Sequence, residues 1–399
     1  MSLLGMKTVV IGGGIGGLAV ARALALRGAS VTLLEQAEAI REVGAGLQIS
    51  PNGFAVLKAL GLDQALQQGA VQGQAVSLRD YRKGEVLRLD LTQLSDQSYY
   101  FVHRADLIDI LAEGAREAGV KIRLLQKVDR VTPATSQTPA SLHLANGSHL
   151  EADLVIGADG LHSVLRPMLN GADKAFFTGQ VAWRAVVPNT MARGPEAWVH
   201  MAPGRHLVSY PLRDGKSINL VAVQERADWT EEGWFHKDEP ANLRRAFADF
   251  GAEAQALLGA VDDVRLWGLF RHPVAEVWQG GHCALLGDAA HPTLPFLAQG
   301  ASMALEDAWA LADELALSDD APSGLAAYQH RRKARATKVI NAATGNAWKY
   351  HLSAPPLRFA AHTALRLAGR FAPGKMLHQF DWLYAHDETA RPTAGGCSD

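Results

Sequence analysis

Two short apolar runs with a helical pattern between them open the chain. Residues 7–11, KTVVI, form a β-branched run that is typical of a buried parallel strand. The next run, LAVARALALRG, has the spacing of a helix and closes at Gly28, and a second strand pattern, SVTLLE, ends in Glu35. The order strand, helix, strand predicts a βαβ unit.

Two later segments repeat the transition from an apolar run to a polar turn. Residues 152–166 read ADLVIGADGLHSVLR, in which a buried strand runs into Asp159 before a helix opens. Residues 282–292 read HCALLGDAAHP, in which a strand runs into Asp288 and a turn. Both segments therefore predict a carboxylate just beyond the end of a buried strand.

Residues 287–308, GDAAHPTLPFLAQGASMALEDA, change character half-way along. The first half has two prolines three apart and a Gly-Asp opening, which would break a helix or a central strand. From Gly300 onward the pattern is helical, and Leu305, Ala308, Ala312 and Leu315 recur at the spacing of a core face. The segment predicts an irregular loop that leads directly into a helix N-terminus.

The run RHLVSYPLRDG at residues 205–215 predicts a strand of a second sheet. His206 and Tyr210 are four residues apart, so an unbent strand places both side chains on the same face. An imidazole with an ordinary pKa of about 6.5 can act as a base at neutral pH. We predict His206 as a catalytic base and Tyr210 as its relaying or orienting partner. A histidine bonded structurally within the sheet is the alternative.

Composition narrows the class of protein. The chain has 399 residues, enough for two cooperating domains, and a formal net charge of -2 gives no electrostatic case for nucleic acid. The two cysteines, Cys283 and Cys397, allow no disulfide framework or CxxC metal site, which fits a reducing cytoplasm. Five glycines and Arg22 interrupt the N-terminal apolar run, which argues against a secretory signal. We expect a cytoplasmic protein with no integral membrane segment and no metal.

The first βαβ unit carries a complete dinucleotide fingerprint, Gly12-x-Gly14-x-x-Gly17. Gly12 permits the tight turn, Gly14 lets the backbone approach a pyrophosphate, and Gly17 allows close packing of helix on strand. The helix that begins near Ile15 then presents free N–H groups and a partial positive charge. Glu35, followed by Gln36, is placed to bind an adenosine ribose. The fingerprint alone does not separate NAD from FAD.

Together, the glycine fingerprint, Asp159-Gly160 and Gly287-Asp288 resemble the motifs of the single-component FAD-dependent aromatic hydroxylases, the group A flavoprotein monooxygenases. Further matching stretches are VGAGLQISPNG at 43–53, HRADL at 103–107, WRAVVP at 183–188, YPLRDG at 210–215 and MALEDA at 303–308. The resemblance covers nearly the whole chain. Its nearest branch contains salicylate hydroxylase, 3-hydroxybenzoate 6-hydroxylase and 6-hydroxynicotinate 3-monooxygenase.

The resemblance implies an α/β fold in which a Rossmann-like FAD-binding domain is interleaved with a mixed-sheet substrate domain. The implied FAD-binding parts are 1–72, 101–178 and 271–345, and the implied substrate-domain parts are 73–100 and 179–270. Residues 346–390 are expected to form a C-terminal helical segment, which packs on the core, joins a homodimer or lies on a membrane surface. Residues 391–399 are expected to be a disordered tail.

By the same resemblance, Asp288 contacts the ribose or pyrophosphate of FAD. Asp159 serves the pyrophosphate and aids the approach of NAD(P)H. Arg104 matches the family's FAD-contacting arginine, and Arg41 is a second candidate for that role. Gln126 either touches the adenosine end or is structural. NADH or NADPH is implied as a transient co-substrate, because no second dinucleotide fingerprint is present.

The loop before Gly300 is expected to lie against the flavin ring. Gly300, Ala301 and Ser302 would aim backbone donors and the positive end of the helix dipole at the edge of the ring that becomes anionic on reduction. Pro295 lies where the family keeps a proline beside the carbon that reacts with oxygen. The resemblance implies that a flavin hydroperoxide transfers one oxygen atom to a small phenolic acid or hydroxypyridine acid.

Three further residues are candidates for contact with that substrate. Gln299 and Leu297 lie at the expected flavin edge, and Arg184 either binds a substrate carboxylate or forms a surface salt bridge. Several relatives carry a second histidine just before the tyrosine, where this chain has Ser209, so the identity of the phenol base and of the substrate stays open. The expected partners are therefore an aromatic substrate, O2 and NAD(P)H, with a monomer or homodimer as the assembly.

Three other functions share this fold. A flavin halogenase would carry Trp-x-Trp-x-Ile-Pro, but here Ala185 replaces the second tryptophan after Trp183. A flavin-dependent oxidase or dehydrogenase, or a flavin-free binding protein, would also be compatible with the fold. The three intact cofactor motifs argue against a lost cofactor.

Overall fold

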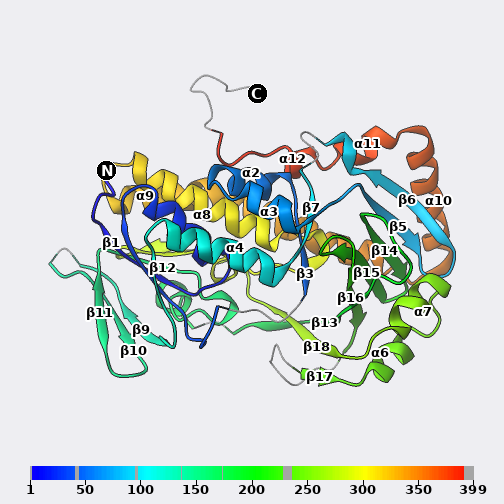
Figure 1. Ribbon diagram of the computed structural model, residues 1–399, viewed down its shortest axis with the longest axis horizontal. Coiled ribbons are helices and arrows are strands. Elements are labelled where there is room, and N and C mark those ends of the chain that lie inside the picture. The colour runs from blue at the N-terminus through cyan, green and yellow to red at the C-terminus, as the bar shows by residue number, and fades with distance from the viewer. Residues whose placement is uncertain are drawn as a thin grey trace.

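The computed structural model describes residues 2–40, 45–94, 98–135, 137–172, 174–227 and 236–390. The predicted cofactor residue Arg41 and the predicted disordered tail, 391–399, lie outside the described residues. Figure 1 shows a long molecule with a sheet at each end and helices between and around them.

A six-stranded sheet in the order β19-β20-β12-β1-β2-β8 organises one half of the molecule. Its strands are β1 (Lys7–Ile11), β2 (Ser30–Leu34), β8 (Lys121–Arg123), β12 (Leu154–Gly157), β19 (Gln279–Gly280) and β20 (Cys283–Leu285). All neighbours pair in parallel except β19 with β20. The βαβ prediction is therefore confirmed: α1 (Ile15–Ala25) connects β1 to β2.

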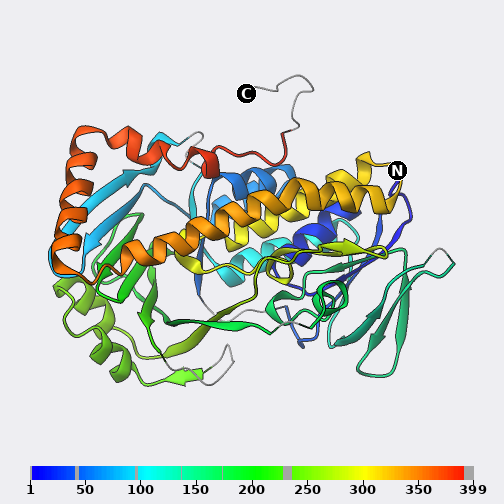
Figure 2. The same cartoon turned by 180° about the vertical axis from the view of Figure 1, so that it is seen from behind.

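Helices cover this sheet and fill the centre of the molecule. They are α4 (Arg104–Glu117), α8 (Gly300–Leu317) and the long α9 (Ala321–Tyr350), with α2 (Pro51–Ala59), α3 (Asp63–Gly69) and α5 (Arg166–Asn170) beside them. The predicted core positions Leu305, Ala308, Ala312 and Leu315 on α8 are all fully buried, so the helical pattern from Gly300 was correct. Figure 2 shows α9 crossing the back of the molecule from one half to the other.

An eight-stranded sheet in the order β17-β18-β13-β16-β15-β14-β5-β6 forms the other half. Its strands are β5 (Ala75–Asp80), β6 (Gly84–Asp90), β13 (Phe176–Pro188), β14 (Glu196–Ala202), β15 (Arg205–Leu212), β16 (Ser217–Glu225), β17 (His236–Asp238) and β18 (Val264–Arg271). One face buries Trp183, Leu207 and Leu220 with apolar residues of α6 (Pro240–Ala246) and α7 (Ala252–Gly259). The other face is left for the first half of the molecule.

Two small sheets and the C-terminal helices complete the fold. The small sheets contain β3 (Gly46–Ile49), β7 (Tyr100–His103) and β4 (Val71–Gln72), and β9 (Val128–Thr132), β10 (Ala140–Leu144) and β11 (His149–Ala152). The last helices are α10 (Pro355–Phe371), α11 (Pro373–His378) and α12 (Asp381–Tyr384), and 3-10 turns span Leu91–Gln93, Gly160–His162, Gly287–Ala289 and Pro295–Leu297. The predicted mixed α/β class is confirmed. Within the described ranges, no helix is both long and apolar enough to cross a bilayer.

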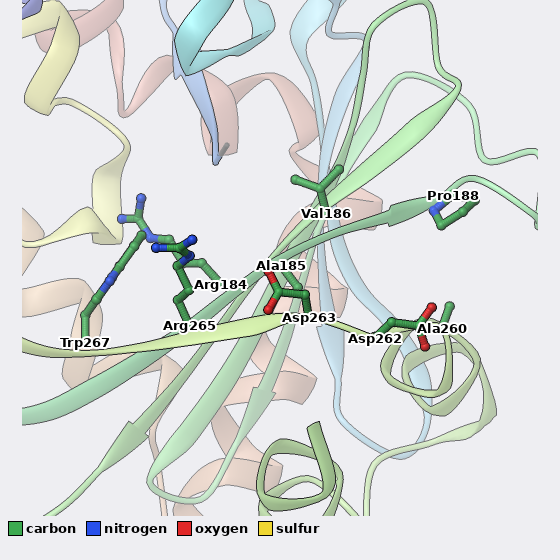
Figure 3. A pocket seen from close by; sticks show the side chains of 9 residues that line it. All are labelled: Arg184, Ala185, Val186, Pro188, Ala260, Asp262, Asp263, Arg265 and Trp267. Atoms are coloured by element: carbon green, nitrogen blue, oxygen red, sulfur yellow. The ribbon is translucent and has the colours of Figure 1, made fainter. Parts of the chain in front are cut away.

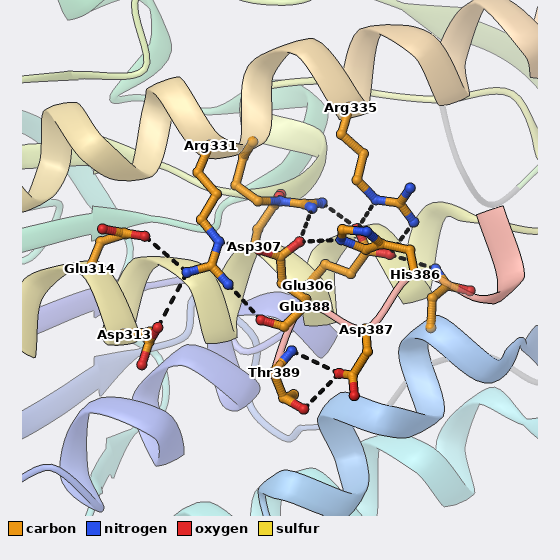
Figure 4. A network of polar contacts seen from close by, with 12 residues as sticks. Glu306, Asp307, Asp313, Glu314, Arg331, Arg335, His386, Asp387, Glu388 and Thr389 are labelled. Carbon is orange, nitrogen blue, oxygen red and sulfur yellow. Dashed lines mark hydrogen bonds and ion pairs between the residues drawn. The ribbon is translucent and has the colours of Figure 1, made fainter. Parts of the chain in front are cut away.

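A buried ion cluster locks α8 to α9 and to the C-terminal segment (Figure 4). The fully buried guanidinium of Arg332 lies 2.7 Å from Glu306, 2.8 Å from Asp307 and 2.6 Å from Glu388. Burial alone would raise the pKa of Glu306, but Arg332 and Arg335 lower it to about 2. Glu306, His386 and Glu388 could otherwise form a metal site, but arginines already neutralise both carboxylates.

We predict that Arg332→Met destabilises the fold by about 3–5 kcal/mol, because it leaves the buried Asp307 with no arginine partner among the described residues and takes one of two arginine partners from Glu306 and Glu388. Urea denaturation followed by circular dichroism measures this loss. Lys333→Met is the matched control, since Lys333 pairs with the exposed Glu276 alone among the described residues and its loss should leave the unfolding midpoint unchanged. Equal midpoints for the two variants would contradict the structural role of the cluster.

Candidate active site

The predicted dinucleotide turn has a geometry that requires glycine at two of its three motif positions. A Cβ atom on Gly12 would lie 2.4 Å from the carbonyl oxygen of Ala158, and one on Gly17 would lie 2.0 Å from that of Gly12. A Cβ atom on Gly14 would meet nothing within 4 Å. Gly12 and Gly17 therefore allow close packing of helix on strand, whereas Gly14 borders open space at the start of α1.

The start of α1 has free backbone donors. Among the described residues, no side chain caps this N-terminus, and no acidic residue occupies its first turn, which begins at the buried Ile15. The first N–H groups of a helix have no partner within the helix, and the helix dipole adds a partial positive charge. A phosphate group beside Gly14 would satisfy both.

Glu35 lies directly beside this turn. Its Oε2 accepts a hydrogen bond from Gly13 N at 2.7 Å, and its Oε1 accepts one from Ala37 N at 2.8 Å. The backbone N–H of Gln126 donates to the carbonyl of Glu35, while its side chain donates to the carbonyls of Leu124 and Leu125. Gln126 is thus adjacent to the predicted ribose site but bonded locally. Gln36 is exposed beside Glu35.

Asp159 and Asp288 follow the carboxyl ends of β12 and β20, at the same edge as Gly12 and Glu35. Asp159 Oδ2 accepts from Val164 N at 2.8 Å, while its Oδ1 is buried with no hydrogen-bond partner among the described residues. Burial raises the pKa of both carboxyl groups.

Asp288 is accessible to water and yet densely surrounded by protein, as expected of a side chain in a recess of the surface. The Arg104 guanidinium lies near enough to favour the charged form of Asp288, although burial of Arg104 lowers its own pKa. The parallel sheet thus brings Glu35, Asp159 and Asp288 together at one edge, which is where open α/β sheets bind ligands.

The loop before α8 is irregular, as predicted. Pro295 opens a 3-10 turn, and Ala298 adopts a left-handed conformation with φ of 52° before α8 begins at Gly300. In the part of the chain that the structure describes, no side chain caps α8 and no acid lies in its first turn, so the N–H groups near Gly300 and Ala301 have no side-chain acceptor there. The loop delivers a second free helix N-terminus to the site.

Gln299 braces this loop instead of pointing freely into the site. Its Oε1 accepts from Asn52 at 3.1 Å, and its Nε2 donates to Ser50 at 2.9 Å. Ser302, predicted to contact the cofactor, is buried with its hydroxyl 3.2 Å from that of Ser50. This geometry favours a structural role for the Gln299 side chain over the predicted substrate contact. The neighbouring Leu297 is half-buried.

One face of the eight-stranded sheet meets the loop. His206, Val208 and Tyr210 alternate along β15 and therefore share a face, and in the register Val208 opposes Val221 and Tyr210 opposes Asn219. Arg184 on β13 opposes Val221 and so lies on the same face. Val221 and Val223 pack against Leu294 and Phe296 of the loop. We call this face, with Arg184, His206, Val208, Tyr210 and Asn219, the loop-facing surface.

The predicted pair on β15 is buried and close to other polar groups. His206 is 1% exposed, and burial together with the nearby His351 lowers its pKa well below the ordinary value, so the ring is neutral at physiological pH. Burial raises the pKa of Tyr210. The ring of Tyr210 lies beside Gly46 of β3, whose backbone N–H donates to Asn219 Oδ1 at 2.6 Å.

Arg184 borders an open cavity of about 370 Å³ (Figure 3). Its guanidinium lies 4.5 Å from the centre of the Trp267 ring, and its buried Nε has no hydrogen-bond partner in the described structure. Burial lowers the pKa of Arg184 to about 10, with Tyr210 acting in the opposite direction, so the group stays charged at neutral pH. No ion pair joins Arg184 to a carboxylate of the described residues, and the predicted surface salt bridge is not formed.

Comparison with known proteins gives consistent results across the whole chain. A family model described as an FAD binding domain matches residues 5–343. The chain is 33% identical over 397 residues to a 3-amino-4-hydroxybenzoate 2-monooxygenase of Streptomyces platensis, with 96% of each chain covered. It is 32% identical over 390 residues to the 3-hydroxybenzoate 6-hydroxylase of Polaromonas naphthalenivorans, with 95% of this chain and 96% of the relative covered.

Among solved structures, Klebsiella pneumoniae HpxO complexed with FAD and uric acid superposes with a TM-score of 0.83. The identity is 26%, and the match covers 94% of this chain and 97% of the other. The chain belongs to the FAD-dependent aromatic monooxygenases.

The geometry fits the cofactor of this monooxygenase family. A bound dinucleotide would fill the open space beside Gly14. It would also give partners to the two uncapped helix N-termini and to Asp159 Oδ1, which has none among the described residues. The family assignment confirms the resemblance read from the motifs and shows that the protein is an FAD-dependent enzyme. The halogenase, oxidase and flavin-free alternatives are not favoured by these relatives.

Several polar residues of this monooxygenase site were missed by sequence reasoning. Asn219 interrupts the apolar run INLVAV, which is a visible signal, and Asn52 lies in the ISPNG stretch that carried the resemblance. His351 contacts the predicted base His206, and Glu225 contacts His351. Neither residue has a local sequence signal, because the two lie at the ends of elements far apart in sequence. Cys283 is buried on β20, and burial raises the pKa of its thiol to about 12.

We predict that Gly14→Ala weakens FAD binding by about 10- to 100-fold, because the new methyl group would displace a charged phosphate from its donors. The apoprotein should keep its stability, since a Cβ atom there meets no protein atom within 4 Å. Fluorescence titration of the apoprotein with FAD measures the affinity. Gly69→Ala is the control, because its Cβ atom would also meet no atom within 4 Å. Equal FAD affinities in the two variants would rule out this cofactor position.

Proposed function

We propose that this monooxygenase hydroxylates a small phenolic carboxylic acid of the hydroxybenzoate type, with NADH or NADPH as the reductant. The observation that carries the proposal is the loop-facing surface, where Arg184 provides a cation with no ion-pair partner among the described residues and His206 and Tyr210 provide proton-transfer groups. The names of the two hydroxybenzoate enzymes that it resembles support the same substrate class.

The residues proposed to hold FAD lie along the edge of the parallel sheet. Gly12, Gly14, Ile15 and Gly17 would hold the pyrophosphate of FAD. Glu35 and Gln36 would hold the ribose, and Gln126 would lie near the adenosine end. The remaining parts of the cofactor would be held by Arg104, Asp159, Asp288, Gly300, Ala301 and Ser302. When bound, FAD supplies the redox chemistry by taking a hydride equivalent from NAD(P)H and activating O2 for transfer to the aromatic ring.

The protein side of the reaction is binding, orientation and proton transfer. Arg184 would pair with the substrate carboxylate. This charge-assisted contact, in a half-buried position, would hold the aromatic ring of the substrate against the sheet. Neutral His206 would accept the phenol proton, and loss of this proton would make the substrate ring electron-rich. Tyr210 would orient the phenol oxygen. Pro295 and Phe296, on the loop opposite, would exclude water from the ring.

The test is NAD(P)H oxidation by the FAD-loaded protein, with oxygen and peroxide followed together. The panel is 3-hydroxybenzoate, 3-amino-4-hydroxybenzoate, salicylate, 6-hydroxynicotinate and benzoate as the non-phenolic control. We expect strong stimulation by at least one phenolic acid, little peroxide and a product heavier by one oxygen atom. Stimulation with stoichiometric peroxide, or none with any phenol at full flavin content, would refute hydroxylation of this substrate class.

We predict that Arg184→Gln raises KM for the best phenolic acid by about 10- to 100-fold, the loss expected for a charge-assisted hydrogen bond. The corresponding carboxamide should be used equally well by the variant and the wild type, since it carries no charge for Arg184 to bind. Steady-state kinetics with both compounds measures the difference. Arg226→Gln is the control, because Arg226 also stacks on a tryptophan of the sheet, 5.1 Å from the Trp183 ring centre. An unchanged KM for the acid would exclude Arg184 as its binding group.

A further inference from the structure

A line of three side chains leads from the loop-facing surface to solvent. His206 Nδ1 lies 2.7 Å from His351 Nε2, and His351 Nδ1 lies 2.7 Å from Glu225 Oε1. The His351 side chain is only 2% exposed, whereas that of Glu225 is 53% exposed. The line therefore starts at a buried imidazole and ends at a carboxylate in contact with water.

The main chain holds these three residues in place. The N–H of Gly204, in the turn between β14 and β15, donates to the carbonyl of His351 at 3.2 Å, and its own carbonyl accepts from Glu225 N at 2.9 Å. Gly204 is two residues from His206. Backbone hydrogen bonds as well as side-chain contacts thus join the end of α9, the end of β16 and the start of β15.

The charge of Glu225 dictates the direction of the hydrogen bonds. A carboxylate only accepts, so Nδ1 of His351 carries a proton and its Nε2 accepts from the N–H at Nδ1 of His206. This tautomer leaves Nε2 of His206 unprotonated, with its lone pair available. No described residue forms a hydrogen bond with that atom.

The positive charge that proton uptake creates is better placed on His351 than on His206. Burial lowers the pKa of both rings, but only His351 has a carboxylate, Glu225, that favours its protonated form. His351 is also the C-cap residue of α9, and the partial negative charge of a helix C-terminus stabilises an imidazolium. The arrangement therefore draws a proton away from His206.

We propose that His351 and Glu225 form an exit path for the phenol proton that His206 accepts, an inference that rests on the proposed function. The phenol O–H bond breaks as an N–H bond forms at His206 Nε2. The proton on His206 Nδ1 then passes to His351 Nε2, and the proton on His351 Nδ1 passes to Glu225, from which water takes it. One proton leaves the site, the substrate becomes a phenolate, and both rings end neutral in the opposite tautomer, with the proton on Nε2 instead of Nδ1.

The test follows phenol ionisation and proton release in the FAD-loaded protein without NAD(P)H. The probe is 4-hydroxy-3-nitrobenzoate, whose phenolate is coloured, mixed by stopped flow at a pH below its phenol pKa with an indicator dye in weak buffer. His351→Gln should slow both signals by about 100- to 10,000-fold, the usual contribution of a positioned proton carrier. Glu225→Gln should slow proton release in the same direction. Imidazole added to His351→Ala should restore the rate.

Two controls separate proton transfer from simple structure. The affinity for 4-methoxy-3-nitrobenzoate, which has no phenol proton, should be equal in the wild type and in His351→Gln. His378→Gln should behave as the wild type, because His378 forms a similar imidazole–carboxylate pair with Asp381, 2.9 Å apart, on the exposed surface. FAD content reports whether each variant has folded. If His351→Gln loses its flavin, the test rests on Glu225→Gln, which changes a residue at the surface.

Wild-type rates of ionisation and release in both His351→Gln and Glu225→Gln would overturn the exit path and leave the proposed function intact. No imidazole rescue, together with an altered affinity for the methoxy analogue, would assign His351 a structural role and also overturn it. If the wild type neither ionises the probe nor hydroxylates any phenol of the panel, the proposed function fails and the exit path with it.

Discussion

The position of α8 is the constraint on which the active site depends. Its first residues provide backbone donors beside the loop at 294–297, and about two turns beyond Gly300 it carries Glu306 and Asp307. Both carboxylates are fixed by the buried Arg332, and Asn52 bonds both Glu306 and Gln299. A helix held in this way cannot shift along its axis without leaving charges unpaired in the interior. One ion cluster thus sets the location of the helix N-terminus.

The two halves of the molecule contribute different residues to the proposed site and meet at this loop. The parallel sheet gathers the dinucleotide positions at its carboxyl edge, because parallel strands all end on the same side. The eight-stranded sheet supplies Arg184 from β13 and His206 and Tyr210 from β15, the two strands that flank β16. Apolar contact of Val221 and Val223 with Leu294 and Phe296 closes the junction. A dry junction strengthens every charged contact within it.

The elements that local sequence determines could be predicted. The glycine turn, the buried strands and the helix from Gly300 follow from short-range patterns, and the shared face of His206 and Tyr210 follows from the two-residue period of a strand. The network around Gln299 could not be predicted, because its partners Ser50 and Asn52 come from a distant helix start. His351 and Glu225 depend on how a 30-residue helix docks on the sheet, which no local pattern encodes.

The most direct test of the account is a crystal structure of the FAD-loaded protein with the phenolic acid that best stimulates turnover. The account predicts that the aromatic ring lies between the 294–297 loop and the loop-facing surface. Its carboxylate should contact Arg184, and its phenol oxygen should lie within hydrogen-bond distance of His206 Nε2 or the Tyr210 hydroxyl. A ring bound elsewhere, or bound here with its carboxylate turned away from Arg184, would contradict the account.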